Sequence, residues 1–142
     1  MNPLRILAVV YAVLFAGVTS LSYVPGLADA QGRTFGLFQL DVLDDALHAA
    51  SGLWAALAAW TSLRATRIFF CVFGPLYCLD GLLGLVTGSG YLDLGIVVNG
   101  VLSLPLTTRI LMNLPHIVIG GFAAFAGYVL ARAWAPSAAA RP

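Results

Sequence analysis

Apolar stretches without a charged residue occupy most of the chain, and each is bounded by arginine or aspartate. A helix of about 20 apolar residues crosses the roughly 30 Å hydrocarbon core of a bilayer and satisfies its own backbone hydrogen bonds. Four stretches approach this length, and the third contains one charged residue, Asp80. The pattern predicts an all-α protein with a single membrane domain over residues 1–142 and transmembrane helices at about 4–24, 45–63, 67–89 and 110–134.

The first stretch also has features of a secretory signal peptide, because Arg5 precedes it and Ala28-Asp29-Ala30 follows it like a cleavage site. Cleavage there would give a mature chain that begins at Gln31. The apolar core is longer than that of a usual signal peptide, so we expect a retained first helix.

Arginine placement predicts the orientation, because positive residues beside short loops stay in the cytoplasm. Arg33 and Arg109 fall on one side of the predicted helices, and five arginines fall on the other: Arg5, Arg64, Arg67, Arg132 and Arg141. We therefore expect a membrane protein with both termini in the cytoplasm. The segment at about 94–108 is too short to cross the bilayer and is expected to lie along the outer interface.

The composition agrees with lipid as the surrounding medium. Hydrophobic residues make up 61% of the chain and charged residues 9%, against about a quarter charged in ordinary soluble domains. The mean hydropathy is +0.94. The net charge of +1 provides no basic surface for phosphates, so nucleic acid is not an expected partner. The expected partners are the bilayer, other membrane subunits or further copies of the chain.

Small residues recur at four-residue spacing, which lets helix backbones approach each other in lipid. The glycines expected at helix contacts are Gly52, Gly84, Gly88 and Gly120. Cys71 and Cys78 would lie about 10 Å apart along the third predicted helix. That distance is too large for a disulfide, and we interpret both residues as apolar side chains.

A short motif occurs twice in the chain. Asp45-Ala-Leu-His48-Ala-Ala-Ser-Gly52 and Asn113-Leu-Pro-His116-Ile-Val-Ile-Gly120 both have an acid or amide three residues before a histidine and a glycine four residues after it. This similarity predicts two tandem two-helix repeats that carry their histidines at matched depth.

These two segments, together with the run from Arg67 to Tyr77 and Leu82-Leu-Gly-Leu85, resemble a family of small four-helix bacterial membrane proteins. That family is catalogued only as a domain of unknown function. The resemblance covers about residues 5–130, and Pro115 departs from the leucine-rich pattern of the family. It implies a four-helix fold in the bacterial cytoplasmic (inner) membrane and implies no activity.

The repeated motif has two interpretations. Asp45 and Asn113 are favourable N-cap residues, which would make His48 and His116 helix-end residues in the capping-box position. On this interpretation no cofactor is expected. Alternatively, the two histidines hold a haem b iron from both faces, and Asp45 and Asn113 orient their rings.

Asp80 lies within a predicted membrane helix, where an ionisable residue is costly and often functional. It is either a proton or cation site, or a residue whose polar partner joins two helices. The sequence contains no nucleophile motif, phosphate-binding loop or zinc-ligand set, so no catalytic residue is expected. Three functions follow: a small structural or accessory subunit of a membrane assembly, a two-histidine haem electron carrier, and a proton or small-solute conduit centred on Asp80.

Overall fold

The chain is all-α in the part that its computed structural model describes, residues 1–36, 38 and 40–134. The helices are α1 (Pro3–Leu21), α2 (Val42–Thr61), α3 (Leu63–Thr87), α4 (Gly95–Asn99) and α5 (Leu106–Phe125), which continues through the π-helical turn η1 (Ala126–Leu130) into α6 (Ala131–Ala133). The predicted helical fold is therefore confirmed for these residues. Arg141, one of the arginines used for the orientation, lies outside the described residues.

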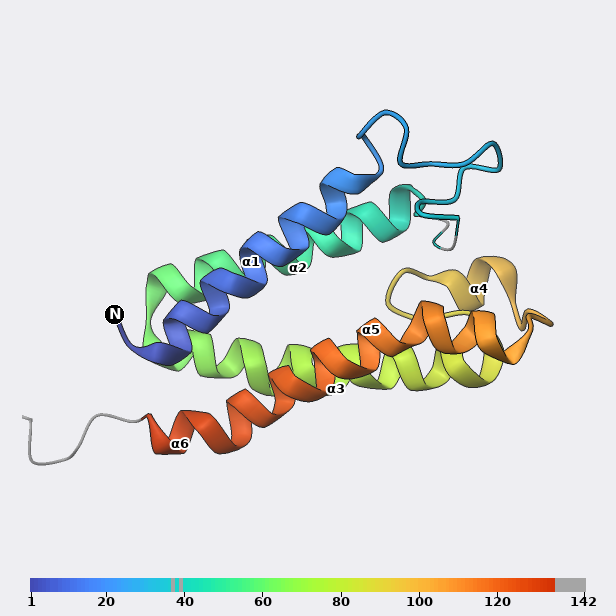
Figure 1. Ribbon diagram of the computed structural model, residues 1–142. Helices are drawn as coiled ribbons and strands as arrows, with labels where there is room; N and C mark the ends of the chain where they lie inside the picture. Colours follow the sequence, from blue (N-terminus) through green and yellow to red (C-terminus); the bar gives the residue numbers. More distant parts are fainter. Residues whose placement is uncertain (37, 39, 135–142) are drawn as a thin grey trace, which may run out of the picture.

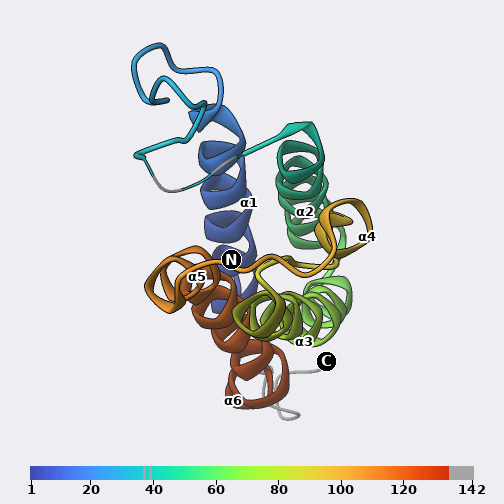
Figure 2. The same cartoon turned by 90° about the vertical axis from the view of Figure 1, so that its right-hand side faces the viewer.

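The helices form two antiparallel pairs. α1 packs along α2, and α3 packs along α5, with α3 also in contact with α2 and α1 (Figure 1). Figure 2 views the helices nearly end-on and shows the α1–α2 pair on one side and the α3–α5 pair on the other. We call these pairs the first and second hairpins.

Among the described residues, three helices are long and apolar enough to cross a membrane: Pro3–Leu21, Leu63–Thr87 and Leu106–Ala133. α2 has a similar length, but its first two turns carry Asp44, Asp45 and His48, which reduce its apolar character. The fourth predicted crossing therefore stays a prediction. The 94–108 segment contains the short helix α4 and then an irregular stretch that leads into α5.

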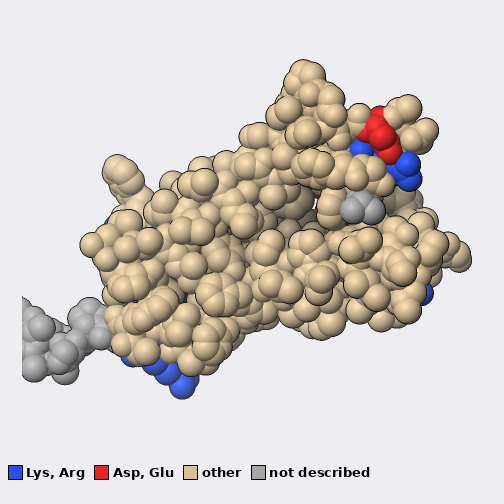
Figure 3. Space-filling model, in the orientation of Figure 1, with Lys and Arg blue, Asp and Glu red and all other residues tan. Residues whose placement is uncertain are grey.

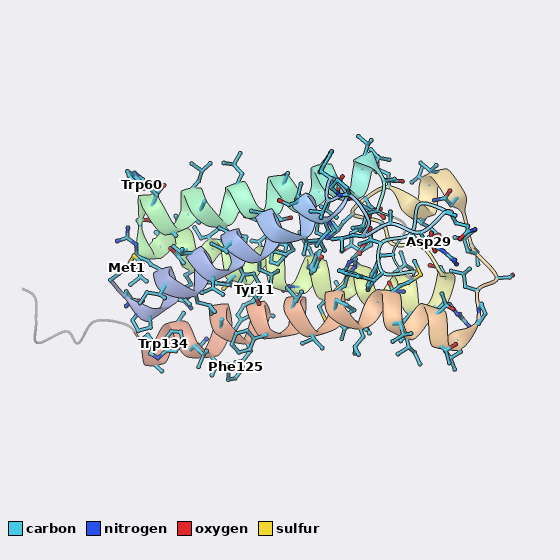
Figure 4. All side chains as sticks on the ribbon, turned by 45° about the horizontal axis from the view of Figure 1, so that its top comes forward. Met1, Tyr11, Asp29, Trp60, Phe125 and Trp134 are labelled. Carbon is cyan, nitrogen blue, oxygen red and sulfur yellow. The ribbon has the colours of Figure 1, made fainter. Side chains whose placement is uncertain are left out.

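Most charged side chains and two of the three tryptophans, Trp60 and Trp134, lie near the ends of the helices. Met1, Trp60 and Trp134 lie at one end, and Asp29 lies at the other (Figure 4). The Asn2 amide donates a hydrogen bond of 2.9 Å to the Trp134 carbonyl at the first end. On the face drawn in Figure 3, charged side chains gather near the two ends, and the band between them carries none. This arrangement is that of a protein with its middle in lipid.

Arginine side chains satisfy the C-terminal end of one helix in each hairpin. The last carbonyls of a helix have no partner within it and attract positive charge. Arg5 at the start of α1 donates to the Ala59 and Trp60 carbonyls of α2, at 2.7 and 3.0 Å. Arg109 in α5 donates in the same way to Leu85 and Val86 of α3. Arg109, which counted against the predicted orientation, thus has a local structural partner.

An aromatic cluster fills the interior between the hairpins. Its rings are buried and lie 4.9–6.3 Å from neighbouring rings, mostly in edge-to-face or stacked geometry. The members come from α1 and α3, and they are Tyr11, Phe15, Phe69, Phe70, Phe73 and Tyr77. Tyr11, which is labelled in Figure 4, also donates a hydrogen bond of 2.8 Å to the Ile119 carbonyl of α5.

Pro75 lies within α3 and cannot donate to the carbonyl four residues earlier, that of Cys71. The Tyr128 hydroxyl of η1 donates to this carbonyl at 3.0 Å. The second hairpin therefore satisfies a backbone acceptor that α3 alone leaves without a partner.

Glycines lie where helix backbones approach most closely. A Cβ atom on Gly52 would lie 3.2 Å from the Phe15 Cβ of α1, and one on Gly120 would collide with the Cys78 backbone of α3. Gly84 faces the Asn113 side chain. Gly88 differs from the expectation, because it ends α3 in the left-handed conformation with φ of +80°.

Gly120→Ala is expected to lower the melting temperature of the detergent-purified protein, because the added methyl group forces α3 and α5 apart at a cost of about 1–3 kcal/mol. Gly121→Ala is the matched control, since a Cβ there meets nothing within 4 Å. The control should be neutral or slightly stabilising through helix propensity. Equal destabilisation by both substitutions would contradict the described α3–α5 contact.

Candidate functional site

The helix-end interpretation of the repeated motif is wrong. α2 begins earlier than predicted, at a capping box in which Asp41 is the N-cap residue and Asp44 is its partner three residues on. α5 begins after Pro105, so Asn113 and Pro115 lie inside the helix. The two preceding carboxylates already provide the α2 cap.

The four motif residues therefore lie within helices and face protein. Asp45 is buried and accepts a hydrogen bond of 2.9 Å from Ser22 at the end of α1. His48 and Asn113 are buried as well, and the Asn113 amide donates to the Arg109 carbonyl. His116 is partly exposed, and its ring centroid lies 6.4 Å from that of His48. The structure thus brings together the two histidines that the motif singled out.

Asp80 joins three segments of the chain. Its side chain is only 1% exposed. Oδ1 accepts hydrogen bonds from the backbone N–H groups of Tyr91 at 2.6 Å and Leu92 at 2.9 Å. Oδ2 lies 2.9 Å from Nδ1 of His116, and we assign the ring N–H as the donor because the carboxylate already acts as an acceptor. Asp80 therefore connects α3 to the 88–94 loop and to α5.

Tyr77 connects the two histidines. Its hydroxyl lies 3.2 Å from Nε2 of His48, and its ring packs against that of His116 with centroids 4.5 Å apart. The His48 ring also stacks on that of Phe15, with centroids 5.8 Å apart. Sequence reasoning missed Tyr77, because a single tyrosine in an apolar helix has no distinguishing pattern.

The residues do not fit a haem held between His48 and His116. Their ring planes are inclined by 68°, and the fully buried Tyr77 side chain contacts both rings. Nε2 of His48, a usual iron ligand, faces the Tyr77 hydroxyl. Gly52 and Gly120, which would have to make room for the macrocycle, lie in close backbone contacts instead. We derive no redox step from these histidines.

A polar cavity of about 420 Å³ lies at the Asp29 end of the molecule, between the two hairpins. Figure 3 shows the surface hollowed there, between the N-terminal end of α2 and the α4 segment. The lining residues that carry polar side chains are Asp41, Asp44, His48, Ser89, Asp93, Asn99, Asn113 and His116. The cavity is therefore the place where the predicted histidines meet carboxylates that the sequence did not connect with them.

The carboxylates come from two distant segments, the start of α2 and the loop before α4. Asp44 lies in the first turn of α2, before the charge-free stretch that the sequence predicts to enter lipid. Burial, with a smaller contribution from the Asp93 and Asp41 carboxylates, raises the pKa of Asp44 to about 7. Asp93 and Ser89 were also missed by sequence reasoning, because their distance from Asp44 along the chain hides their proximity.

Comparisons of the chain with models of protein families, with curated proteins and with solved structures find no match. The resemblance to a family of four-helix membrane proteins therefore stays an expectation, and the site is interpreted from its own chemistry.

The raised pKa of Asp44 predicts that stability falls as pH rises from about 4, the value of a free aspartate, to about 7. In this window the folded state holds the proton and the unfolded state releases it. The melting temperature in detergent should therefore be lower at pH 8 than at pH 5. Asp44→Asn should raise it at pH 8 and reduce the difference, since an amide oxygen still accepts from the Asp41 N–H.

Asp29→Asn is the control for this pH effect. The hydrogen bond from the Arg33 backbone is the main cause that lowers the pKa of Asp29, so loss of its charge should not stabilise the protein at pH 8. An unchanged pH dependence in Asp44→Asn would contradict the prediction.

Asp80→Leu is expected to speed hydrogen exchange at the Tyr91 and Leu92 amides by at least about tenfold, because each buried N–H without an acceptor costs about 1–3 kcal/mol. Asp80→Asn retains an acceptor oxygen and should have a smaller effect. The Gly95 amide, which donates to Asp93, is the internal reference. Unchanged exchange at residues 91 and 92 in Asp80→Leu would show that the carboxylate does not hold this loop.

Proposed function

We propose that the chain is a small accessory subunit of the bacterial cytoplasmic membrane, a four-helix transmembrane bundle that binds a ligand in an outward-facing cavity and does not conduct. On this proposal the part of α2 that follows Asp44 is the fourth crossing, both termini are cytoplasmic, and the cavity faces the outside. The proposal assigns no catalytic step and no haem.

The closed floor of the cavity is the observation that carries this proposal. His48 and His116 form the floor, and beneath them the ring of Tyr77 stacks on Phe73 at 4.9 Å. Phe73 stacks in turn on Phe69 at 5.0 Å. A conduit needs polar groups or a water-filled path through the apolar layer. The aromatic cluster fills that position, so the geometry favours binding at one end over passage through the molecule.

Asp80 fits a structural role in this proposal. Both of its carboxylate oxygens have partners, two backbone N–H groups and His116. Of the two alternatives for Asp80, these contacts favour a residue whose polar partners join two helices. They therefore support the accessory subunit over a conduit centred on Asp80.

The two hairpins support the proposed tandem repeat. In each hairpin the glycine that follows the motif histidine packs against the other helix of the same hairpin: Gly52 of α2 on α1, and Gly120 of α5 on α3. This contact at corresponding places is what a duplicated two-helix unit would retain. The arginine contacts do not correspond in this way, because Arg5 of α1 binds the end of the following helix and Arg109 of α5 binds the end of the preceding one.

Cysteine accessibility tests the proposed arrangement. In a Cys71→Ala, Cys78→Ala background, Asn99→Cys at the cavity should react with a membrane-impermeant maleimide added to intact cells. The matched variant Thr61→Cys, at the exposed turn between α2 and α3, should react only after permeabilisation. The reverse pattern would contradict the orientation.

Proteoliposomes that contain the full chain should show no proton or potassium flux above empty vesicles, with gramicidin as the positive control. Flux that is lost in Asp80→Asn would contradict the accessory role and support the conduit.

A further inference from the structure

The lining of the cavity has an unbalanced charge. Asp41, Asp44 and Asp93 contribute carboxylates, and no arginine lines the cavity in the part of the chain that the structure describes. Arg109 directs its guanidinium to the Leu85 and Val86 carbonyls instead. A ligand of this cavity must therefore be neutral or positively charged, and positive charge is favoured.

Each of two facing carboxylates keeps one oxygen for a ligand. Oδ2 of Asp44 accepts from the Asp41 N–H, and Oδ1 of Asp93 accepts from the Gly95 N–H. The two carboxylates also lie within hydrogen-bonding distance of each other, so that without a cation they share a proton. The N–H groups of an ammonium ion are suitable donors for these oxygens.

Buried polar atoms without a partner provide an independent indication of a ligand. His48 is 5% exposed and Ser89 is 6% exposed, and both line the cavity. Within the described residues, Nδ1 of His48 and Oγ of Ser89 have no hydrogen-bond partner. Buried polar groups in folded proteins are almost always satisfied by protein, water or ligand. These two atoms are unsatisfied in the same cavity as the carboxylates.

Size and lining distinguish an organic cation from a metal ion. The cavity volume of about 420 Å³ falls in the range of small-molecule sites, roughly 300–1,000 Å³. Apolar side chains complete its wall: Phe38, Leu40, Leu43, Val98, Leu102 and Met112. No group of three histidine, cysteine or acidic side chains suited to a metal ion occurs among the residues that the structure covers.

We propose that this cavity binds a small organic ammonium ion with a short apolar portion. The ammonium group lies between the Asp44 and Asp93 carboxylates, Ser89 and His48 provide further hydrogen-bonding groups, and the apolar portion contacts the Val98 and Leu102 side. The inference rests on the ligand-binding role proposed above and adds the class of ligand.

Titration calorimetry on the full chain in nanodiscs at pH 8 tests the inference, with butylammonium chloride as the probe. We expect saturable binding in the millimolar range or tighter. 1-Butanol has a similar size and no charge, and it should show only the heat of partitioning into lipid. Asp93→Asn should weaken butylammonium binding at least tenfold while the amide oxygen still caps the Gly95 N–H.

Asp29→Asn is the matched control, because it removes the same charge from a loop carboxylate that does not line the cavity. Its affinity should equal that of the unmodified chain. Ser89→Ala is expected to weaken butylammonium binding severalfold. It provides a second test of the site if Asp93→Asn proves unstable.

Absence of saturable butylammonium binding would overturn the ligand class, as would binding that Asp93→Asn and Ser89→Ala leave unchanged. Calcium chloride that binds in the cavity where butylammonium does not would also overturn it and would indicate a metal ion. The accessibility of Asn99→Cys separates these failures from failure of the proposed function. Outward labelling without amine binding refutes only the ligand class, whereas inward labelling refutes the outward-facing cavity itself.

Discussion

The fully buried carboxylate of Asp80 is the constraint on which the cavity end of the molecule depends. A charge in this position is tolerated only with close partners, and the chain supplies two backbone N–H groups and His116. These partners fix the 88–94 loop over α3 and hold the His116 ring of α5 against α3. The wall that carries Ser89 and Asp93 is thus positioned by an aspartate that does not itself line the cavity.

The packing of the remaining molecule differs along its length, with close helix contacts and aromatic packing in the middle and a cavity at one end. Glycine lets α3 and α5 approach along much of their length. Aromatic rings from α1 and α3 fill the space between the hairpins. Towards the Asp29 end the side chains become charged or polar, and a cavity replaces the ring packing. One bundle therefore combines an apolar, close-packed interior with a polar recess at one end.

The sequence predicted the helices because charged residues mark the ends of apolar stretches, and Asp80 and the histidines stand out as polar residues within them. The residue at which each helix begins was harder to predict. Asp41 and Asp44 compete with Asp45 for the start of α2, and only the folded backbone selects among three neighbouring carboxylates. With Asn113 as the predicted N-cap residue, Pro115 would lie in the first turn of its helix, yet α5 begins earlier and accommodates this proline in its interior.

The acidic part of the cavity could not be predicted, because Asp44 and Asp93 meet only after both hairpins have folded. Asp44 belongs to a capping box that indicates only a helix start, and Asp93 belongs to no motif. The loop that carries Asp93 is positioned by Asp80 through contacts to backbone atoms, which sequence patterns do not record. Long-range proximity of this kind depends on tertiary structure alone.

The arginine contacts at the helix ends have a consequence for biogenesis. Each joins the two helices of one hairpin, Arg5 to the end of α2 and Arg109 to the end of α3. The first hairpin can therefore close its own polar helix end before the second hairpin is synthesised, and the second closes its end without contacts from the first. On the proposed four-crossing topology, membrane insertion can proceed in two self-contained steps, and the aromatic rings between the hairpins join them in the final assembly.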